Sequence, residues 1–338
     1  MDPRQRWRIH KAGNIANLIL DDTPLGPLAE DQVRVHVQAV GLNFADIFAL
    51  TGLYSATPSG PFTPGLEFAG TVDAIGARVA DYRPGDRVMG VTRFGGYTTR
   101  IDSPEGYLRI LPDHWSMEQG AAYLAQTLTA WYALTELGQV RPGHRVLIHS
   151  AAGGVGLQAM KLCQALGAHP VGTVSHIDKQ DFLHQAGFEA VLVREKDFAA
   201  QLRRHSLQFD LVLDAIGGHI QKASFDALDA MGRLVVFGAA EFTPSGQRPD
   251  YLRALWRYLR RPRYDVMDMI SSNRSVMAFN LIWLWEQQDT LQRLLDALEK
   301  VQISPPHVGH HFAFEQAHQA LDCLRSGKTV GKVVLIQQ

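Results

Sequence analysis

The chain has 338 residues, of which 46% are hydrophobic and 20% are charged, and its formal net charge at pH 7 is −1. This length and composition are typical of a globular protein with a large core, and at about 150 residues per unit they predict two domains. A net charge near zero creates no overall electrostatic field that would attract nucleic acid or anionic lipid, so any basic patch must be local.

The first part of the chain, to about residue 120, consists of short apolar runs separated by turns. The runs include QVRVHVQAVGL, FAGTVDAIGA and GDRVMGV, and the turns include PSGPFTPG and YRPGD. Short strands between turns rich in glycine and proline predict a compact, barrel-like β domain.

From about Ala121 the pattern changes to the helical periodicity of AAYLAQTLTAWYALTEL, which ends at Gly138. Short apolar runs then alternate with helical stretches. The runs are RVLIHS, PVGTVS, AVLV, FDLVLDAI and RLVVFGA. This βαβ rhythm predicts a doubly wound parallel sheet.

After Arg263 the pattern is mixed. A strand-like VMAFNLIWL is followed by the amphipathic helix LQRLLDALEKV and, at the end, by the strand KVVLIQQ. No helix follows this last strand. It could therefore complete the sheet of the first domain, which would make the parallel domain an insertion.

The sequence also bears on the cellular compartment. The first residues lack the apolar core of a secretory signal, and no apolar run approaches the ~20 residues that span a bilayer. We therefore expect a cytoplasmic protein in which Cys163 and Cys323 are reduced thiols.

The strongest local pattern is SAAGGVG, residues 150–156, between the apolar run RVLIH and an amphipathic helix. Gly153 and Gly154 permit a tight turn whose backbone, continuing through Val155, approaches a pyrophosphate closely. Gly156 permits close packing of helix on strand, and the helix N-terminus favours an anion. Because the order is strand, turn and helix, we expect this loop to bind a dinucleotide.

The residues after the next two strands predict which dinucleotide binds. Ser175 stands nineteen residues beyond Gly156, where NAD-dependent enzymes usually carry an acid for the ribose 2′-hydroxyl. Lys179 and Arg194 instead provide cations that can reach a 2′-phosphate. We therefore predict NADPH. The alternative is a pair of solvated charges, and Asp178 beside Lys179 favours it to some extent.

Together with this loop, several stretches resemble the medium-chain dehydrogenase/reductase superfamily, specifically its zinc-independent quinone oxidoreductase group, which is zeta-crystallin-like. They are GLNFADIFALTGLY, PGLEFAGTV, PGDRVMG, GTVS with Lys179, and GKTVGKVVLI, and they span nearly the whole chain. SNRSVMAFNL is similar to the vesicle amine transport protein branch. The resemblance implies an α/β fold with a GroES-like, β-rich catalytic domain, residues 1–124 and 271–338, and an inserted Rossmann domain, residues 125–270.

The resemblance also implies that zinc is absent. Zinc-dependent relatives place a Cys three residues before an Asp, and a His before a Glu; this chain has Asn43 before Asp46 and Leu66 before Glu67. Leucine cannot ligate zinc, and asparagine is a poor substitute for a thiolate. We expect no metal in the HVGHH stretch either, because the family resemblance places it in a structural β segment.

By position in the family motif, Asn43 lies near the nicotinamide and Tyr54 offers a hydroxyl to a carbonyl oxygen, so both are candidate catalytic residues that position the substrate. For Tyr54 the alternative is a merely packed aromatic ring. Phe48 and Leu50 replace a tyrosine and an arginine that are common in quinone reductases, which favours a bulky hydrophobic acceptor. The expected cofactor-binding residues are Asn43, Phe44, Asp46, Tyr132, Gly153, Gly154, Val155, Gly156, Ser175, Lys179, Arg194, Ala215, Phe237, Gly238 and Lys332.

Two kinds of function are compatible with the sequence. The first is NADPH-dependent reduction of a quinone or another electron-poor conjugated carbonyl, such as an enone or alkenal, without zinc. The second is a nonenzymatic NADPH-binding protein that associates with lipid or regulates a partner. It is favoured by residues 252–264, where five arginines alternate with leucine, tryptophan and tyrosine in a basic amphipathic pattern. A solvated helix that covers the cleft or packs on a second subunit remains the simpler interpretation, and no nucleic acid is expected.

The strand-like segment at about residues 275–283 predicts a homodimer. In the superfamily this segment is the edge of the dinucleotide sheet, and an apolar edge is an aggregation hazard unless it is paired or covered. Pairing with its own copy would bury Met277, Phe279, Leu281 and Trp283. The alternative is coverage by the basic 252–264 segment within one subunit.

Overall fold

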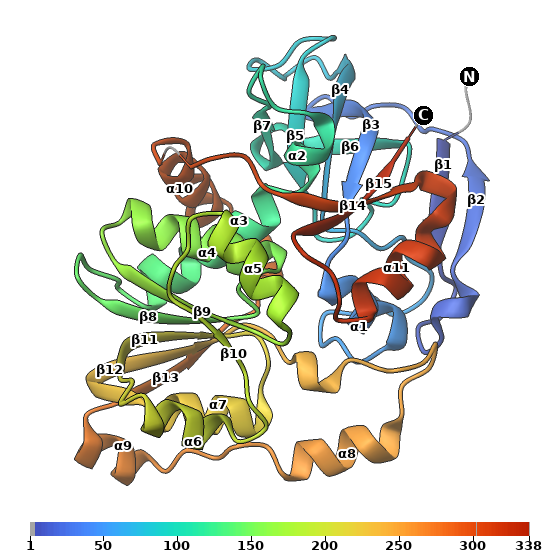
Figure 1. Cartoon of the computed structure of the whole chain (residues 1–338). Helices are drawn as coiled ribbons and strands as arrows, with labels where there is room; N and C mark the ends of the chain where they lie inside the picture. The colour runs from blue at the N-terminus through green and yellow to red at the C-terminus, as the bar shows by residue number, and fades with distance from the viewer. Residues whose placement is uncertain (1–3, 302, 338) are drawn as a thin grey trace.

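The computed structural model describes residues 4–301 and 303–337 and contains two large sheets that lie side by side (Figure 1). One is a mainly antiparallel sheet of seven strands, and the other is a parallel sheet of six strands. The expected α/β fold, with a β-rich domain and an inserted Rossmann domain, is confirmed. Within the described ranges no helix is long and apolar enough to cross a bilayer.

The antiparallel sheet has the order β14, β15, β3, β4, β5, β7, and β6 also pairs with β3. Along β3, buried side chains alternate with half-buried ones because only one face of the strand packs on the core. The last strand, β15, pairs antiparallel with β3, so the end of the chain completes the sheet of the first domain. The strands outside the parallel sheet are β1 (Arg4–Arg8), β2 (Ile19–Thr23), β3 (Gln32–Gly41), β4 (Glu67–Ile75), β5 (Arg87–Val91), β6 (Arg100–Pro104), β7 (Leu108–Ile110), β14 (Val308–Ala313) and β15 (Lys332–Ile336).

The second sheet has the order β10, β9, β8, β11, β12, β13, and each neighbouring pair is parallel. Helices α4 (Gly154–Ala165) and α5 (Ile177–Gln185) cover one face, and α6 (Phe198–Arg204) and α7 (Gly218–Asp226) cover the other, which explains why the strands are mainly apolar (Figure 1). The predicted doubly wound sheet is therefore confirmed. Its strands are β8 (Arg145–His149), β9 (His169–Val174), β10 (Val191–Val193), β11 (Phe209–Asp214), β12 (Leu228–Val236) and β13 (Ser275–Ala278).

Strand β13 corrects two expectations. The Rossmann domain was expected to end at residue 270, but β13 pairs with β12 and extends the parallel sheet to Ala278. Two α-helices, the arginine-rich Tyr251–Leu259 and then Val266–Ser272, interrupt the βαβ rhythm before the chain returns to the sheet edge. The strand is also shorter than the expected 275–283, because the Asn280 side chain accepts the Ile282 N–H and starts the 3₁₀ helix Leu281–Glu286.

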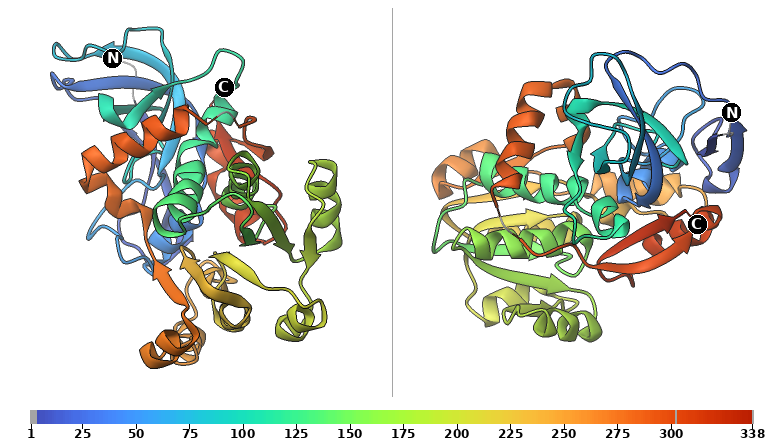
Figure 2. Two further views of the ribbon diagram at one scale, coloured as in Figure 1. Left: turned by 90° about the vertical axis from the view of Figure 1, so that its left-hand side faces the viewer. Right: turned by 90° about the horizontal axis from the view of Figure 1, so that it is seen from above.

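The C-terminal segment joins the two domains. The Gly331 N–H donates to the Ala152 carbonyl at 2.7 Å, so the start of β15 rests on the glycine-rich loop. Both views of Figure 2 show this red segment beside the blue N-terminal sheet. The helices are α1 (Phe44–Thr51), α2 (Met117–Ala121), α3 (Leu124–Trp131), α4 (Gly154–Ala165), α5 (Ile177–Gln185), α6 (Phe198–Arg204), α7 (Gly218–Asp226), α8 (Tyr251–Leu259), α9 (Val266–Ser272), α10 (Gln288–Glu299) and α11 (Ala317–Arg325), and a π-helix, Tyr132–Leu137, continues α3.

Candidate active site

The glycine-rich loop lies between β8 and α4, as the sequence predicts. Ser150 adopts a left-handed φ of 54°, Gly153 is the N-cap, and α4 starts at Gly154. A Cβ at Gly156 would overlap the Ser150 carbonyl oxygen, so only glycine allows the helix to approach the strand this closely. The loop therefore fits a pyrophosphate held by the backbone N–H groups at the start of α4.

The residues predicted to bind the 2′-phosphate lie at the carboxyl ends of β9 and β10. Ser175 is exposed directly after β9, Lys179 lies in α5, and Arg194 follows β10. Burial lowers the pKa of Lys179, and the nearby Arg194 charge lowers it further. In the part of the chain that the structure describes, neither cation pairs with a carboxylate; Lys179 donates to the Gly327 carbonyl at 2.7 Å and Arg194 to the hydroxyl of Thr173 at 3.1 Å. An anionic group here would relieve the repulsion between the two cations.

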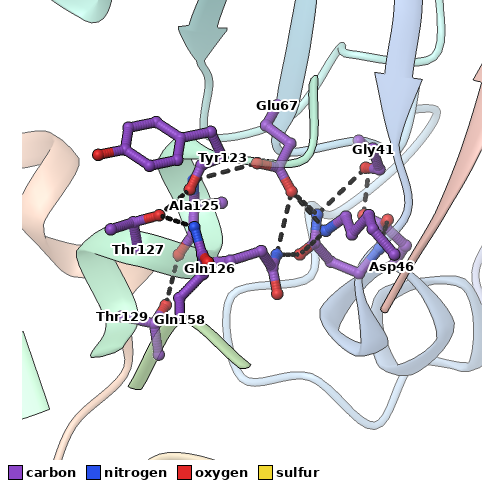
Figure 3. A network of polar contacts seen from close by, with 12 residues as sticks. Gly41, Asp46, Glu67, Tyr123, Ala125, Gln126, Thr127, Thr129 and Gln158 are labelled. Atoms are coloured by element: carbon purple, nitrogen blue, oxygen red, sulfur yellow. Dashed lines mark hydrogen bonds and ion pairs between the residues drawn. The ribbon is translucent and has the colours of Figure 1, made fainter. Parts of the chain in front are cut away.

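A buried ion pair joins β15 to β4, the two strands that lie on either side of β3. The Lys332 ammonium is 2.5 Å from Glu67 Oε1, and the two residues are 3% and 0% exposed. Glu67 also accepts the Ala125 N–H at 3.0 Å and the Gln126 side-chain N–H at 3.0 Å (Figure 3). Burial lowers the pKa of Lys332, against the opposing effect of Glu67. Lys332 is thus held inside the protein one residue after the contact with the glycine-rich loop.

The Asn43 side chain is fully used by this network. Its Oδ1 accepts from Gln126 at 2.5 Å and from Lys332 at 3.0 Å, and its Nδ2 donates to Glu67 Oε1 at 3.1 Å and to the Gly41 carbonyl at 3.2 Å. The amide therefore has no hydrogen-bonding capacity left for a substrate unless one of these bonds breaks. Its predicted role in positioning the substrate remains a prediction.

Asp46 is fully buried and lies next to this network, since its carboxylate bonds to the backbone of Asn43. Its carboxylate accepts from the Asn43 N–H at 2.7 Å, the Tyr97 hydroxyl at 3.1 Å and the Gly65 N–H at 3.2 Å. Burial raises its pKa to about 7. Because the side chain is 0% exposed, the predicted contact with a cofactor would require it to leave these partners. In the structure it caps α1 and holds the loop at Gly65.

Aromatic and small residues gather at the carboxyl edge of the parallel sheet, where ligands bind in open α/β folds. The Tyr132 ring lies 4.9 Å from that of Phe279, and Phe237 lies 6.1 Å from it. A Cβ at Gly238 would come within 2.8 Å of the Ala215 carbonyl oxygen, so these two strand ends adjoin closely. The structure thus brings four predicted residues together. Phe279, expected on a dimer surface, instead packs inward on this cluster because the extended run ends at Ala278.

Tyr54 joins the two domains across this region. Its hydroxyl donates to Asn280 Oδ1 at 2.7 Å, although the residues are 226 positions apart. Burial raises the pKa of Tyr54 to about 12. Phe44, at the first turn of α1, is 39% exposed and is thus available for contact.

Three residues of this region are missing from the predicted site: Glu67, Gln126 and Asn280. Two of them had a visible signal, because Gln126 is a polar residue within an apolar helix and Asn280 interrupts the apolar run VMAFNLIWLW. Nothing in the neighbouring sequence indicated that Glu67 would pair with Lys332 in the last strand of the chain.

The residues at the two zinc-ligand positions do not fit a metal. Leu66 offers no ligand atom, and the Asn43 oxygen already lies 3.0 Å from the Lys332 ammonium. Among the residues that the structure describes, no group of three or more His, Cys, Asp or Glu side chains is arranged to hold a metal ion.

Comparisons with known proteins agree with this architecture. Residues 29–116 match the alcohol dehydrogenase GroES-like domain, and residues 187–335 match a family described as zinc-binding dehydrogenase. The Synaptic vesicle membrane protein VAT-1 homolog of Homo sapiens is 32% identical over 333 residues, which cover 96% of this chain and 84% of that protein. For the Danio rerio homolog the values are 30% identity, 91% and 64%.

Solved structures give the same result. Escherichia coli quinone oxidoreductase in complex with NADPH has a TM-score of 0.81 and 28% identity, with 98% of this chain and 99% of that chain covered. CurK enoyl reductase has a TM-score of 0.82 and 27% identity, with both chains fully covered at 100%. The chain therefore belongs to the medium-chain dehydrogenase/reductase family of oxidoreductases, in its VAT-1-like branch.

Proposed function

We propose that the chain is an NADPH-dependent oxidoreductase that reduces a quinone or another electron-poor conjugated carbonyl without zinc. One observation carries this proposal: the Lys332 ammonium, paired with Glu67, contacts Asn43 at a position where zinc-dependent relatives have a metal ligand. Because the Lys332 ammonium already contacts the oxygens of Asn43 and Glu67, these residues cannot form a set of ligands for a divalent ion. The chemistry must then come from the dinucleotide, for which the loop at 153–156 is shaped.

NADPH, when bound, supplies a hydride and leaves as NADP⁺. The loop would hold its pyrophosphate, and Lys179 and Arg194 would bind the 2′-phosphate, with Ser175 at the same strand end. Two structural neighbours, at 27% and 28% identity, are described as complexes with NADPH.

The residues of this chain would orient the acceptor and exclude water. Tyr132, Phe237 and Phe279 provide an apolar surface at the edge of the sheet, and such a surface suits a flat, hydrophobic acceptor. Both acceptor classes have a precedent among the structural neighbours, since two quinone oxidoreductases and an enoyl reductase are similar to this chain.

Steady-state oxidation of NADPH in the presence of a benzoquinone, an enone or an alkenal tests the proposal. We expect oxidation that depends on both protein and acceptor, and faster turnover with NADPH than with NADH at equal low concentrations. Absence of turnover with every conjugated acceptor would reject the reductase function, whereas equal turnover with both nucleotides would reject the assignment of the 2′-phosphate site.

A second candidate function, association with an anionic membrane surface, is favoured by α8 and α9. Nine of the 15 large hydrophobic side chains that are exposed in the described ranges lie on these two helices. Residues 251–263 also carry five arginines and no acid, on a chain whose net charge is −1. Apolar and cationic groups on one exposed segment suit the interface of an anionic bilayer.

Co-sedimentation with vesicles of phosphatidylserine and phosphatidylcholine tests this second function. We expect binding that salt weakens, little binding to phosphatidylcholine alone, and loss of binding on Trp256→Ser, whose side chain is 54% exposed. The matched control is Trp283→Ser, an exposed tryptophan outside these helices. Equal binding to both vesicle types, or no effect of Trp256→Ser, would contradict the proposal.

We also propose a homodimer formed at β13, which is the outer strand of the parallel sheet. Pairing with a second copy would satisfy the free edge of this strand and would cover neighbouring side chains of α9. We assign the dimer contacts to the edge of β13 and to α9, and not to the side chains of Phe279 and Met277, because these two pack towards the core of their own subunit.

A further inference from the structure

The Asn280 side chain is held at its oxygen and is free at its nitrogen. Oδ1 accepts the Tyr54 hydroxyl at 2.7 Å and the Ile282 N–H at 3.4 Å. Because both donors face the oxygen, Nδ2 points away from them. Among the described residues, none accepts a hydrogen bond from this nitrogen. The half-buried amide thus presents two oriented N–H donors that no protein group uses.

The other amides near the proposed site differ in this respect. Asn43 uses its oxygen and its nitrogen within the Lys332–Glu67 network, and Gln126 Nε2 donates to both Asn43 and Glu67. Asn280 is therefore the amide of this group whose N–H donors remain available to a ligand.

The position of Asn280 is suited to contact with an acceptor. It directly follows Phe279, whose ring packs against Tyr132 and Phe237 at the carboxyl edge of the parallel sheet. Its partner Tyr54 comes from the other domain, after α1. The amide thus lies at the junction of the cofactor domain and the catalytic domain, where the reacting atoms must meet.

We propose that Asn280 donates the hydrogen bond to the carbonyl oxygen of the acceptor, and that Tyr54 is a positioning residue that orients the Asn280 amide. This inference rests on the proposed function. Hydride addition to the electron-poor carbon moves the π-electron pair of the conjugated system onto the carbonyl oxygen, which gives an enolate or hydroquinone anion. The Asn280 N–H groups stabilise this anion, and water supplies the proton that completes the two-electron reduction.

Tyr54 is better suited to orienting the amide than to protonating the product. Burial raises its pKa to about 12, so the hydroxyl keeps its proton near neutral pH and continues to donate to Asn280. The neighbouring cation Arg93 is occupied, because it pairs with Glu286 at 2.6 Å and lies 5.2 Å above the Trp283 ring.

Two substitutions separate the roles of the two residues. Asn280→Asp keeps the size of the side chain and an oxygen that accepts from Tyr54, but it removes both N–H donors and adds a negative charge. We expect kcat to fall about 100-fold, as on loss of an oxyanion donor, with unchanged affinity for NADPH. Tyr54→Phe loosens the amide without removing its donors, so kcat should fall only about tenfold or less. Asn17→Asp, at an exposed position, is the charge-matched control.

A binding measurement decides the inference without turnover. A nitrophenolate mimics the hydroquinone anion, and we expect it to bind the wild-type complex with NADP⁺ about tenfold or more tightly than the Asn280→Asp complex. Asn280→Ala, which adds no charge, should also weaken binding, and thermal unfolding checks that each variant is folded.

Equal nitrophenolate affinity in the wild type and both Asn280 variants, or no binding by the wild type, would overturn the inference. A larger loss of kcat in Tyr54→Phe than in Asn280→Ala would reverse the two roles and would also overturn it. If the wild type reduces no acceptor, the proposed function fails, and the nitrophenolate titration still decides the role of Asn280.

Discussion

Replacing Lys332 by methionine should destabilise the protein by about 3–5 kcal/mol, the usual cost of leaving one member of a buried ion pair without its partner. Lys332 and Glu67 are 3% and 0% exposed, so water cannot replace the lost partner without local opening. Methionine keeps most of the volume of the lysine stem, and the expected loss is therefore mainly electrostatic.

Two single variants, Lys332→Met and Glu67→Gln, each remove one member of the pair. The contacts that the other member keeps place the two variants at opposite ends of this range. In Lys332→Met, Glu67 keeps three donors, from Ala125, Gln126 and Asn43, so the cost should be near 3 kcal/mol. In Glu67→Gln, the ammonium loses its counter-charge and keeps Asn43 Oδ1, so the cost should be nearer 5 kcal/mol. The double variant buries no charge and should lose less than the sum of the two, with a coupling energy of about 2 kcal/mol or more.

Urea unfolding followed by circular dichroism measures all three variants, with Lys196→Met as the exposed-lysine control. Unchanged m-values would show that the compactness of the folded and unfolded states is retained. A loss below about 1 kcal/mol in Lys332→Met, or losses that simply add in the double variant, would refute a tight buried pair.

Lys179→Ala should weaken NADPH binding roughly tenfold or more and NADH binding little, and fluorescence titration that finds equal losses would remove Lys179 from the 2′-phosphate site. Burial raises the pKa of the Asp46 carboxyl group from 3.8 to about 7, so between these pH values the folded protein keeps a proton that the unfolded chain has released. The free energy of unfolding should therefore fall as the pH rises from about 3.8 to about 7. Asp46→Asn should lack this part of the fall, and equal slopes for the two proteins in urea unfolding would contradict the raised pKa. Ile270→Asp, on exposed α9 beside β13, should weaken the proposed dimer in sedimentation equilibrium and Ile177→Asp should not; a wild type that is monomeric at micromolar concentration would reject the dimer.

The first five strands of the parallel sheet, β8 to β12, could be predicted from the sequence because they are short, mainly apolar and separated by helical stretches. The glycine-rich loop could be predicted for a related reason, since Gly156 meets a local steric requirement that no other residue satisfies. Both features depend on neighbours in the sequence, so their patterns are visible without the fold.

The features that were missed depend on distant contacts. Lys332 and Glu67 are 265 positions apart, and neither residue shows in the sequence that it will be buried against the other. Asn43 matched a family motif, but its hydrogen bonds depend on Gln126 and Lys332, which two other elements supply. Likewise, the boundary at residue 270 was placed too early, because α8 and α9 separate β13 from β12 in the sequence although the two strands pair in the sheet.

NADPH-dependent reduction without a metal can be measured on protein from which metal ions have been removed. Protein dialysed against a strong chelator is mixed with NADPH and a benzoquinone, and the loss of NADPH absorbance is followed before and after addition of zinc. We predict that the chelated protein retains its full rate and that zinc does not raise it, because Lys332 and Leu66 leave no ligand set for the ion. Loss of activity on chelation, restored by stoichiometric zinc, would show that the reaction requires the metal.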